Sequence, residues 1–335
     1  MDMVHRPDAG KRGSGAGEPG KDRNVMKEIV VISGKGGTGK TSLTAAFAAM
    51  GGKQVLADCD VDAADLHLVL NPEIIREDVF IGGSKASIRE EDCTGCGLCV
   101  EHCRFRAIEY PVAASGDRAD KPRINPVFCE GCRVCVRICP VEAIAFDPAE
   151  SGRLFVSRTP LGPMVHACLG VAQGNSGKLV TLVRNEARAI AEREACELII
   201  IDGPPGVGCP VIASITGANL ALIVTEPTLS GHHDMQRAAE LTAHFLIPTL
   251  VCVNKWDIHP GMTERIEKEA RDHGVIPAGR IRYDQLVTEA QVRRTNVLAC
   301  GDSPIGEEIK ALWRCIEGAL NGARTGGAGL KTVPP

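Results

Sequence analysis

The chain has 335 residues, of which 44% are hydrophobic and 24% are charged, which excludes a mini-protein and a chain that is disordered throughout. Only 3% of the residues are aromatic, so the core has to be built from aliphatic side chains, as buried parallel sheets usually are. The formal net charge of -4, with both signs mixed along the chain, gives no general attraction for nucleic acid or anionic lipid. Any polyanion binding would have to be local, and we do not expect nucleic acid as a partner.

The first part of the chain alternates strand and helix patterns after a polar start. Residues 1–25 are rich in glycine and charge and predict a disordered tail, and Met26 directly after it is a candidate start of translation. The elements predicted next are a strand at 28–33, a helix at 40–50, a strand at 55–58 and an apolar segment at 66–70. A glycine-rich turn joins the first strand to the first helix.

The alternation stops between residues 84 and 150, where clustered cysteines predict an inserted domain, and resumes afterwards. The later predicted elements are a helix at 177–195, strands at 198–201 and 220–224, a helix at 231–245, a strand at 249–253, helices at 262–273 and 304–321, and a flexible tail at 323–335. Strands that alternate with helices indicate an α/β domain, here residues 26–83 and 151–322, with a mostly parallel sheet and helices on both faces. The insert is expected to be small and α+β.

The glycine-rich turn carries the complete G-x-x-x-x-G-K-[ST] motif of a phosphate-binding loop. Backbone N–H groups and the start of the following helix bind phosphates in such loops, the Lys40 side chain reaches the terminal phosphates, and the Thr41 hydroxyl binds Mg²⁺. The residues predicted to contact the nucleotide here are Gly34, Lys35, Gly36, Gly37, Thr38, Gly39, Lys40, Thr41 and Ser42.

An additional lysine, Lys35, distinguishes this loop from an ordinary phosphate loop. The pattern K-G-G-x-G-K-[ST] resembles the deviant Walker A motif of the MinD/ParA family of ATPases. The resemblance implies a P-loop NTPase fold, ATP and Mg²⁺ as cofactors, and a nucleotide-sandwich dimer of identical or related chains. In that dimer Lys35 would reach into the partner's site and neutralise charge on the transferring phosphoryl group, as an arginine finger does.

Two acidic strand ends resemble the switch segments of the same family. Asp202 follows the strand at 198–201 and would hold the Mg²⁺ shell, and Asp60 would orient the attacking water. Asp58 is either a surface carboxylate at a strand end or takes a direct part. The catalytic residues expected from the resemblance are therefore Lys35, Lys40 and Asp60.

Asn254 and Lys255 follow the strand at 249–253 and are expected to contact the base. In the MinD/ParA family an asparagine at this place reads adenine, but N-K-x-D, which ends here at Asp257, also selects guanine in GTPases. The Lys35 pattern favours ATP over GTP.

Eight of the 15 cysteines form two runs with the spacing C-x₂-C-x₂-C-x₃-C of bacterial ferredoxins. Because the fourth cysteine of each run binds the other cluster in such proteins, the pattern predicts two [4Fe-4S] clusters. The first set is Cys93, Cys96, Cys99 and Cys139, and the second is Cys129, Cys132, Cys135 and Cys103. Zinc is the alternative for C-x-x-C pairs, and Arg104 stands where a proline usually follows the first run.

Clustered thiolates are typical of a reducing compartment, and no signal segment or membrane span is recognisable, so we expect a cytoplasmic protein without an integral membrane segment. Cys209 lies seven residues after Asp202, at the offset where the related nitrogenase iron protein has a cluster ligand. No second ligand matches, because Cys168 has the wrong spacing, and the role of Cys209 stays open between a ligand and a packed thiol.

These features predict an ATPase whose nucleotide state controls electron transfer or the delivery of an iron-sulfur or other metal cofactor to a redox or metal-cofactor protein. The chain is similar in this respect to the ATPases of orange-protein-type complexes. The alternative is a positioning or assembly ATPase of MinD type with structural or sensory clusters.

Overall fold

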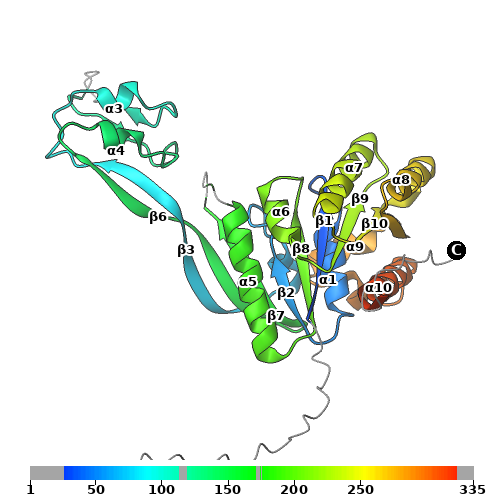
Figure 1. The fold of residues 1–335 in the computed structure, drawn as a ribbon. Helices are drawn as coiled ribbons and strands as arrows, with labels where there is room; N and C mark the ends of the chain where they lie inside the picture. Colours follow the sequence, from blue (N-terminus) through cyan, green and yellow to red (C-terminus); the bar gives the residue numbers. More distant parts are fainter. Residues whose placement is uncertain (1–25, 113–118, 171–173, 175, 323–335) are drawn as a thin grey trace, which may run out of the picture.

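The computed structural model describes residues 26–112, 119–170, 174 and 176–322, so the tails predicted at 1–25 and 323–335 lie outside the described residues. Within these residues one nine-stranded sheet forms the body of the molecule, in the order β11-β10-β9-β1-β8-β2-β7-β6-β3. A small lobe stands apart from this body on a long two-stranded ribbon (Figure 1). The ribbon belongs to the same sheet, because β3 and β6 continue its order at one edge.

The middle of the sheet is parallel and buried on both faces. β1 pairs in parallel with β8 on one side and with β9 on the other. The strands of this part are β1 (Lys27–Ser33), β2 (Gln54–Asp58), β8 (Leu198–Pro205), β9 (Leu220–Thr225), β10 (Thr249–Asn254) and β11 (Ile276–Ile281). Near-continuous Val, Ile and Leu runs in β1, β8, β9 and β10 fit strands that have no solvent-facing side, whereas β11 is a partly exposed edge strand.

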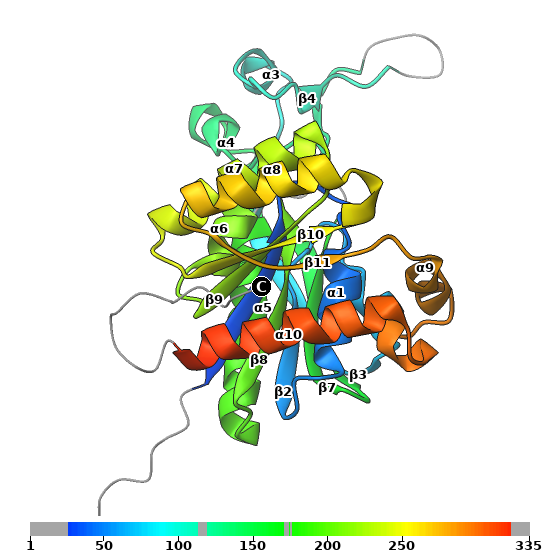
Figure 2. The same cartoon turned by 90° about the vertical axis from the view of Figure 1, so that its right-hand side faces the viewer.

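Helices cover the sheet on both faces and divide the core into two layers. One layer packs Val30 and Ile201 against α5 (Ser176–Glu194), α6 (Cys209–Ile215), α7 (Leu229–His244) and α8 (Pro260–Asp272). The opposite layer packs Ile29 and Ile200 against α1 (Lys40–Ala48), α2 (Leu66–Leu70), α9 (Gln285–Val292) and α10 (Pro304–Gly322). Figure 2 shows α10 crossing this second face. The predicted α/β class with helices on both faces is confirmed.

The ribbon that carries the small lobe is an antiparallel pair of 16-residue strands, β3 (Glu73–Ile88) and β6 (Ile144–Thr159). Near the body β6 also pairs with β7 (Gly162–Leu169), which joins β2 in parallel, whereas β6 residues before Gly152 pair with β3 alone. The domain boundaries predicted at 84 and 150 fall inside these two strands. β3 is exposed along most of its length, whereas β6 is largely buried from Ser151 onward. Neither strand keeps a regular apolar alternation over its 16 residues, so the sequence does not predict the ribbon.

The small lobe is α+β and has its own core. It contains α3 (Leu98–Glu101), α4 (Val134–Ile138) and a two-stranded sheet of β4 (Ile108–Glu109) and β5 (Arg123–Ile124). Ala86, Cys99, Ile108 and Ile144 are buried together beneath the cysteine runs. The expected α+β insert is therefore present at the far end of the ribbon.

Outside the small lobe, for which only the α+β class was predicted, the elements missing from the prediction are β3, β6, β7, β11, α6, α9 and two 3₁₀ turns, Trp256–Ile258 and Val297–Cys300. Among the described residues, no helix combines the length and apolar character needed to cross a membrane.

Candidate functional site

The phosphate loop joins β1 to α1 with the backbone geometry that its glycines permit. Gly37 and Gly39 have left-handed φ angles of 78° and 91°, which glycine adopts without strain. A Cβ atom at Gly39 would also lie 2.4 Å from the amide nitrogen of the Asn254 side chain. Lys40 begins α1 and is only 5% exposed, and the buried Thr38 hydroxyl has no hydrogen-bond partner within the described residues. An unpaired hydroxyl beside a buried lysine at a helix start fits a phosphate-binding cradle.

The residues expected to hold Mg²⁺ meet at the start of α1 and the end of β8. The Thr41 hydroxyl donates a hydrogen bond to Asp202 Oδ2 over 2.7 Å, and the Thr44 hydroxyl lies 3.2 Å from Asp202 Oδ1. Burial raises the pKa of Asp202 to about 6, although the Lys40 ammonium opposes this shift. A hydroxyl and a carboxylate at this place provide the oxygen ligands that Mg²⁺ prefers.

Asp58 and Asp60 leave the end of β2 in different surroundings. Asp58 is fully buried, and its carboxylate accepts hydrogen bonds of 3.1 Å from the N–H groups of Asp60 and Leu66. Burial, followed by repulsion from Asp202, raises the pKa of Asp58. The alternative of a surface carboxylate is therefore wrong for Asp58, which fixes the loop that leads into α2.

Asp60 instead lines the same cavity as Lys40 and Thr41. Partial burial raises its pKa to about 6, although Lys40 opposes the shift. Asp60 therefore borders the cavity beside the phosphate loop, and its role in orienting the attacking water stays a prediction.

Lys35 is held within its own chain by an acidic residue at the end of β9. Its ammonium lies 3.2 Å from Glu226 Oε2 and 3.3 Å from the Ser230 hydroxyl. Lys255 pairs with the other oxygen of Glu226 at 2.5 Å. Burial acts to raise the pKa of Glu226, but the hydrogen bonds from Lys255 and Lys35 lower it below its usual range. No sequence motif indicates Glu226, because its spacing from Lys35 and from Lys255 belongs to no recognised pattern.

The expected base-binding residues line a second cavity next to the phosphate loop, together with Ser42 and Tyr283. The Asn254 amide donates to the Thr38 carbonyl over 2.8 Å, and its oxygen accepts from the Lys255 N–H. Asp257 accepts a hydrogen bond of 2.7 Å from the N–H of Tyr283. Asn254 thus also braces the phosphate loop, a role that the sequence did not indicate.

The eight clustered cysteines surround two cavities in the small lobe. Cys93, Cys96, Cys99 and Cys139 line one cavity, and Cys103, Cys129, Cys132 and Cys135 line the other. The structure therefore brings together the two sets that the sequence predicts, each with the crossed fourth cysteine. The Ala107 N–H donates to Cys103 Sγ at 3.4 Å, and the Ala143 N–H donates to Cys139 Sγ at 3.3 Å. A cavity surrounded by four thiols, with N–H groups directed at sulfur, fits a cubane cluster.

In the described part of the chain, no three His, Cys, Asp or Glu side chains gather as the ligands of a single metal ion. Cys209 is exposed at the start of α6, and Cys168 is exposed on β7. The structure leaves the role of Cys209 open.

Three stacked rings, which the sequence did not reveal, join α2, the helix after the loop of Asp58 and Asp60, to β7 and β6. The ring of His67 on α2 stacks on His166 of β7 at 5.3 Å with an interplanar angle of 4°. His166 in turn stacks on Phe155 of β6 at 4.9 Å and 18°. Burial, followed by repulsion from His67, lowers the pKa of His166 to about 4. The rings connect the segment after Asp60 to the ribbon that carries the small lobe.

The small lobe matches a known family, and about 70% of the chain matches two proteins of Methanocaldococcus jannaschii. Residues 92–143 match the family described as 4Fe-4S dicluster domain. The chain is 37% identical over 236 residues to the uncharacterized protein MJ0578 of Methanocaldococcus jannaschii, covering 69% of this chain and 79% of that protein. The chain belongs to the same family as MJ0578. A second protein of that organism, MJ0579, is 26% identical over 262 residues and matches 70% of this chain and 81% of its own length.

Solved structures show the fold of the body. The MinD cell division protein of Aquifex aeolicus is 18% identical to this chain and has a TM-score of 0.50. The matched region covers 91% of this chain and 100% of that one. A chain in the MinC:MinD cell division protein complex of the same organism is 19% identical and has a TM-score of 0.50. The match covers 92% of this chain and 100% of that one. The chain combines the fold of MinD/ParA-type P-loop ATPases with an inserted 4Fe-4S dicluster domain, which confirms the resemblance drawn from the sequence.

Proposed function

We propose that the chain is a Mg²⁺-dependent ATPase that carries two [4Fe-4S] clusters and uses its nucleotide state to control electron transfer or cofactor delivery by these clusters. One observation carries the coupling. α2 follows the loop of Asp58 and Asp60, and the ribbon strand β3 begins three residues after α2 ends. A movement of that loop on binding or loss of the γ-phosphate is therefore transmitted directly to the base of the ribbon.

The proposed hydrolysis uses residues already close together. Lys40 and the N–H groups of the loop bind the phosphates, and Asp60 orients the attacking water. Thr41 and Asp202 hold Mg²⁺, which when bound neutralises charge on the phosphate oxygens. Lys35 has to leave Glu226 to act in a partner's site, so dimer formation and release of this ion pair belong to the same step.

The base-side geometry supports ATP over GTP. One carboxylate oxygen of Asp257, the residue that would select guanine, already accepts a hydrogen bond from the Tyr283 N–H. Asn254 and Lys255 line the adjoining cavity, and we assign them to adenine.

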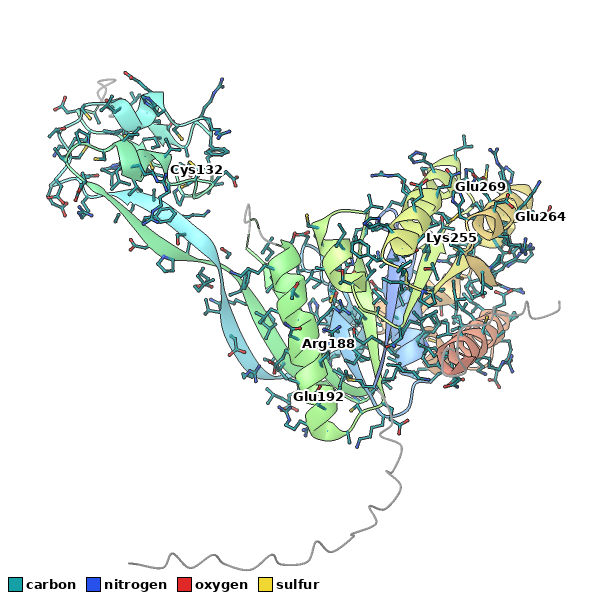
Figure 3. All side chains as sticks on the ribbon, viewed as in Figure 1. Cys132, Arg188, Glu192, Lys255, Glu264 and Glu269 are labelled. Carbon is teal, nitrogen blue, oxygen red and sulfur yellow. The ribbon has the colours of Figure 1, made fainter. Side chains whose placement is uncertain are left out.

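The length of the ribbon decides which kind of coupling can operate. A strand of 16 residues extends about 50 Å at about 3.3 Å per residue, so the thiols and the phosphate loop are not in contact. Figure 3 shows Cys132 and Lys255 at opposite ends of the molecule. Coupling therefore has to be mechanical, and the stack of His67, His166 and Phe155 supplies a second path besides the chain itself.

Iron counting and hydrolysis assays test the proposal. Anaerobically purified protein should contain about eight iron atoms per chain and hydrolyse ATP only with Mg²⁺. The Cys132→Ser variant should lose one cluster and retain hydrolysis without it. Zinc in place of iron would refute the cluster assignment, and absence of hydrolysis in chains with full iron content would refute the ATPase. ATP-dependent binding to vesicles or DNA, together with a rate of cluster reduction that does not depend on the bound nucleotide, would favour the positioning alternative.

A further inference from the structure

The two cysteine sets are related in sequence, but their surroundings differ in charge. The cavity of the first set is lined by uncharged residues besides its cysteines, among them Ile88, Leu98, Pro122 and Val141. The cavity of the second set reaches the surface beside His102, Glu130 and Arg133. A difference of this kind around two similar redox centres indicates that they have different partners.

Three arginines without carboxylate partners are associated with the second set: Arg133 lines its cavity, and Arg104 and Arg106 flank Phe105, which lines it too. Arg104, Arg106 and Arg133 are exposed, and among the described residues none of them pairs with an acidic group. Arg104 lies 5.7 Å from the centre of the Phe105 ring, and Arg133 lies 5.1 Å from that of Phe146. Stacking on rings positions the guanidinium groups but leaves their charge available to a partner.

Two arginines near the first set are paired with carboxylates instead, although Arg137, before Cys139, has no acidic partner among the described residues. Arg89 forms an ion pair of 2.6 Å with Asp92, and Arg123 one of 2.9 Å with Glu90. Glu91 beside them is exposed, so this side of the lobe carries no excess of positive charge.

Apolar side chains are exposed at the same place as the unpaired arginines. Phe105 and Val134, each 37% exposed, line the rim of the second cavity, and Phe128, 57% exposed, precedes Cys129. Cys132 is itself exposed there, in the lobe at the end of the ribbon (Figure 3). Here three exposed arginines outnumber the one carboxylate that lines the cavity, Glu130. Apolar side chains beside an excess of positive charge, with a redox ligand at the surface, are the features of an electron-transfer docking face.

We infer that the face formed by Arg104, Arg106, Arg133, Phe105 and Phe128 docks a small electron-carrier protein whose surface is acidic around its own redox centre. One electron leaves the reduced carrier, which becomes oxidised, and enters the second cluster, which passes from the 2+ to the 1+ state. No bond is formed or broken and no proton moves. The inference rests on the proposed function, because it requires that the second set holds a cluster.

Outer-sphere reagents of opposite charge test the face with the whole protein. The clusters are reduced and then oxidised in a stopped-flow instrument by cobalt(III)-EDTA, an anion, or by hexaammineruthenium(III), a cation. At low ionic strength, the double variant Arg104→Glu with Arg133→Glu should be oxidised about tenfold more slowly than the wild type by the anion and faster by the cation. Both differences in rate should vanish in high salt. A strongly acidic plant-type [2Fe-2S] ferredoxin, used as reduced donor, should also reduce the clusters of the double variant more slowly than those of the wild type.

Two controls separate the outcomes. Arg123→Glu reverses an exposed charge near the first set and should change each oxidation rate less than about twofold. Arg104→Gln removes one charge without reversal and should give a smaller change in the same direction. If the double variant with full iron content reacts like the wild type, or if Arg123→Glu has an equal effect, the docking face is refuted while the proposed function stands. If the wild type contains no iron, the proposed function fails first.

Discussion

At the scale of single residues, the position of Lys35 has the clearest consequence. In one chain its ammonium is paired with Glu226, whereas the proposed chemistry requires it in a partner's site. We predict that Lys35→Ala lowers the ATP hydrolysis rate by at least about a hundredfold, because charge on the transferring phosphoryl group is no longer neutralised. Iron content should not change.

Lys53→Ala, in an exposed loop, is the matched control and should hydrolyse ATP at the wild-type rate. Retained hydrolysis in Lys35→Ala would contradict the sandwich-dimer assignment, with a phosphate-release assay as the readout.

His166 gives a pH dependence with a definite sign. Because its pKa falls from 6.5 to about 4 on folding, the unfolded chain binds a proton between these values that the folded chain does not. Its contribution to stability is therefore complete above about pH 6.5 and is lost as the pH falls toward 4, by up to about 3 kcal/mol. His67 and Phe155 face it from the neighbouring elements.

We predict that His166→Phe, which keeps a ring in the stack, loses less thermal stability than the wild type between pH 7.5 and 5. Equal slopes of melting temperature against pH in the two proteins would show that His166 does not titrate as described.

Residues within contiguous motifs could be predicted, and residues brought together by the fold could not. The phosphate loop and the cysteine runs each lie in one stretch with fixed spacing, so their chemistry can be read directly. His67 and His166 are 99 positions apart and meet only because α2 packs beside β7. The burial of Asp58 likewise depends on the pairing of β2 with both β8 and β7.

At the scale of elements, the ribbon leaves the sheet at a point of close backbone packing. A Cβ atom at Gly152 on β6 would lie 2.6 Å from the Cys168 carbonyl oxygen on β7. We predict that Gly152→Ala destabilises this junction by about 1–3 kcal/mol, because neither backbone can give way. Hydrogen exchange of the β6 and β7 amides should become faster.

Gly318→Ala, where a Cβ meets nothing within 4 Å in helix α10, is the control and should not raise exchange. Unchanged exchange at β6 in Gly152→Ala would mean that the junction adapts to the added methyl group.

The central strands and long helices were predicted to within a few residues because their apolar patterns are continuous. β11 and β7 were not, because β11 contains a proline and a glycine and β7 follows the unrecognised ribbon. The ribbon itself is held by backbone pairing between strands 56 to 85 positions apart, which leaves no local pattern.

At the scale of the whole molecule, the ring stack should transmit the nucleotide state from the body to the ribbon. We predict that His67→Ala retains ATP hydrolysis and iron but loses any change in amide exchange of β3 and β6 between nucleotide states, because α2 no longer contacts the ribbon through His166. His273→Ala, exposed after α8, should behave as the wild type. An undiminished response in His67→Ala would assign the coupling to chain continuity alone.

The central claim is that the nucleotide bound at one end of the molecule changes the behaviour of clusters at the other. The rate at which the clusters of the wild-type protein are reduced should be measured with bound Mg²⁺–ADP and with a bound non-hydrolysable ATP analogue. Our account predicts two different rates, and it also predicts that the difference disappears when Lys40→Ala abolishes nucleotide binding. Identical rates in both states would contradict the account, because the ATPase body and the cysteine lobe would then work independently.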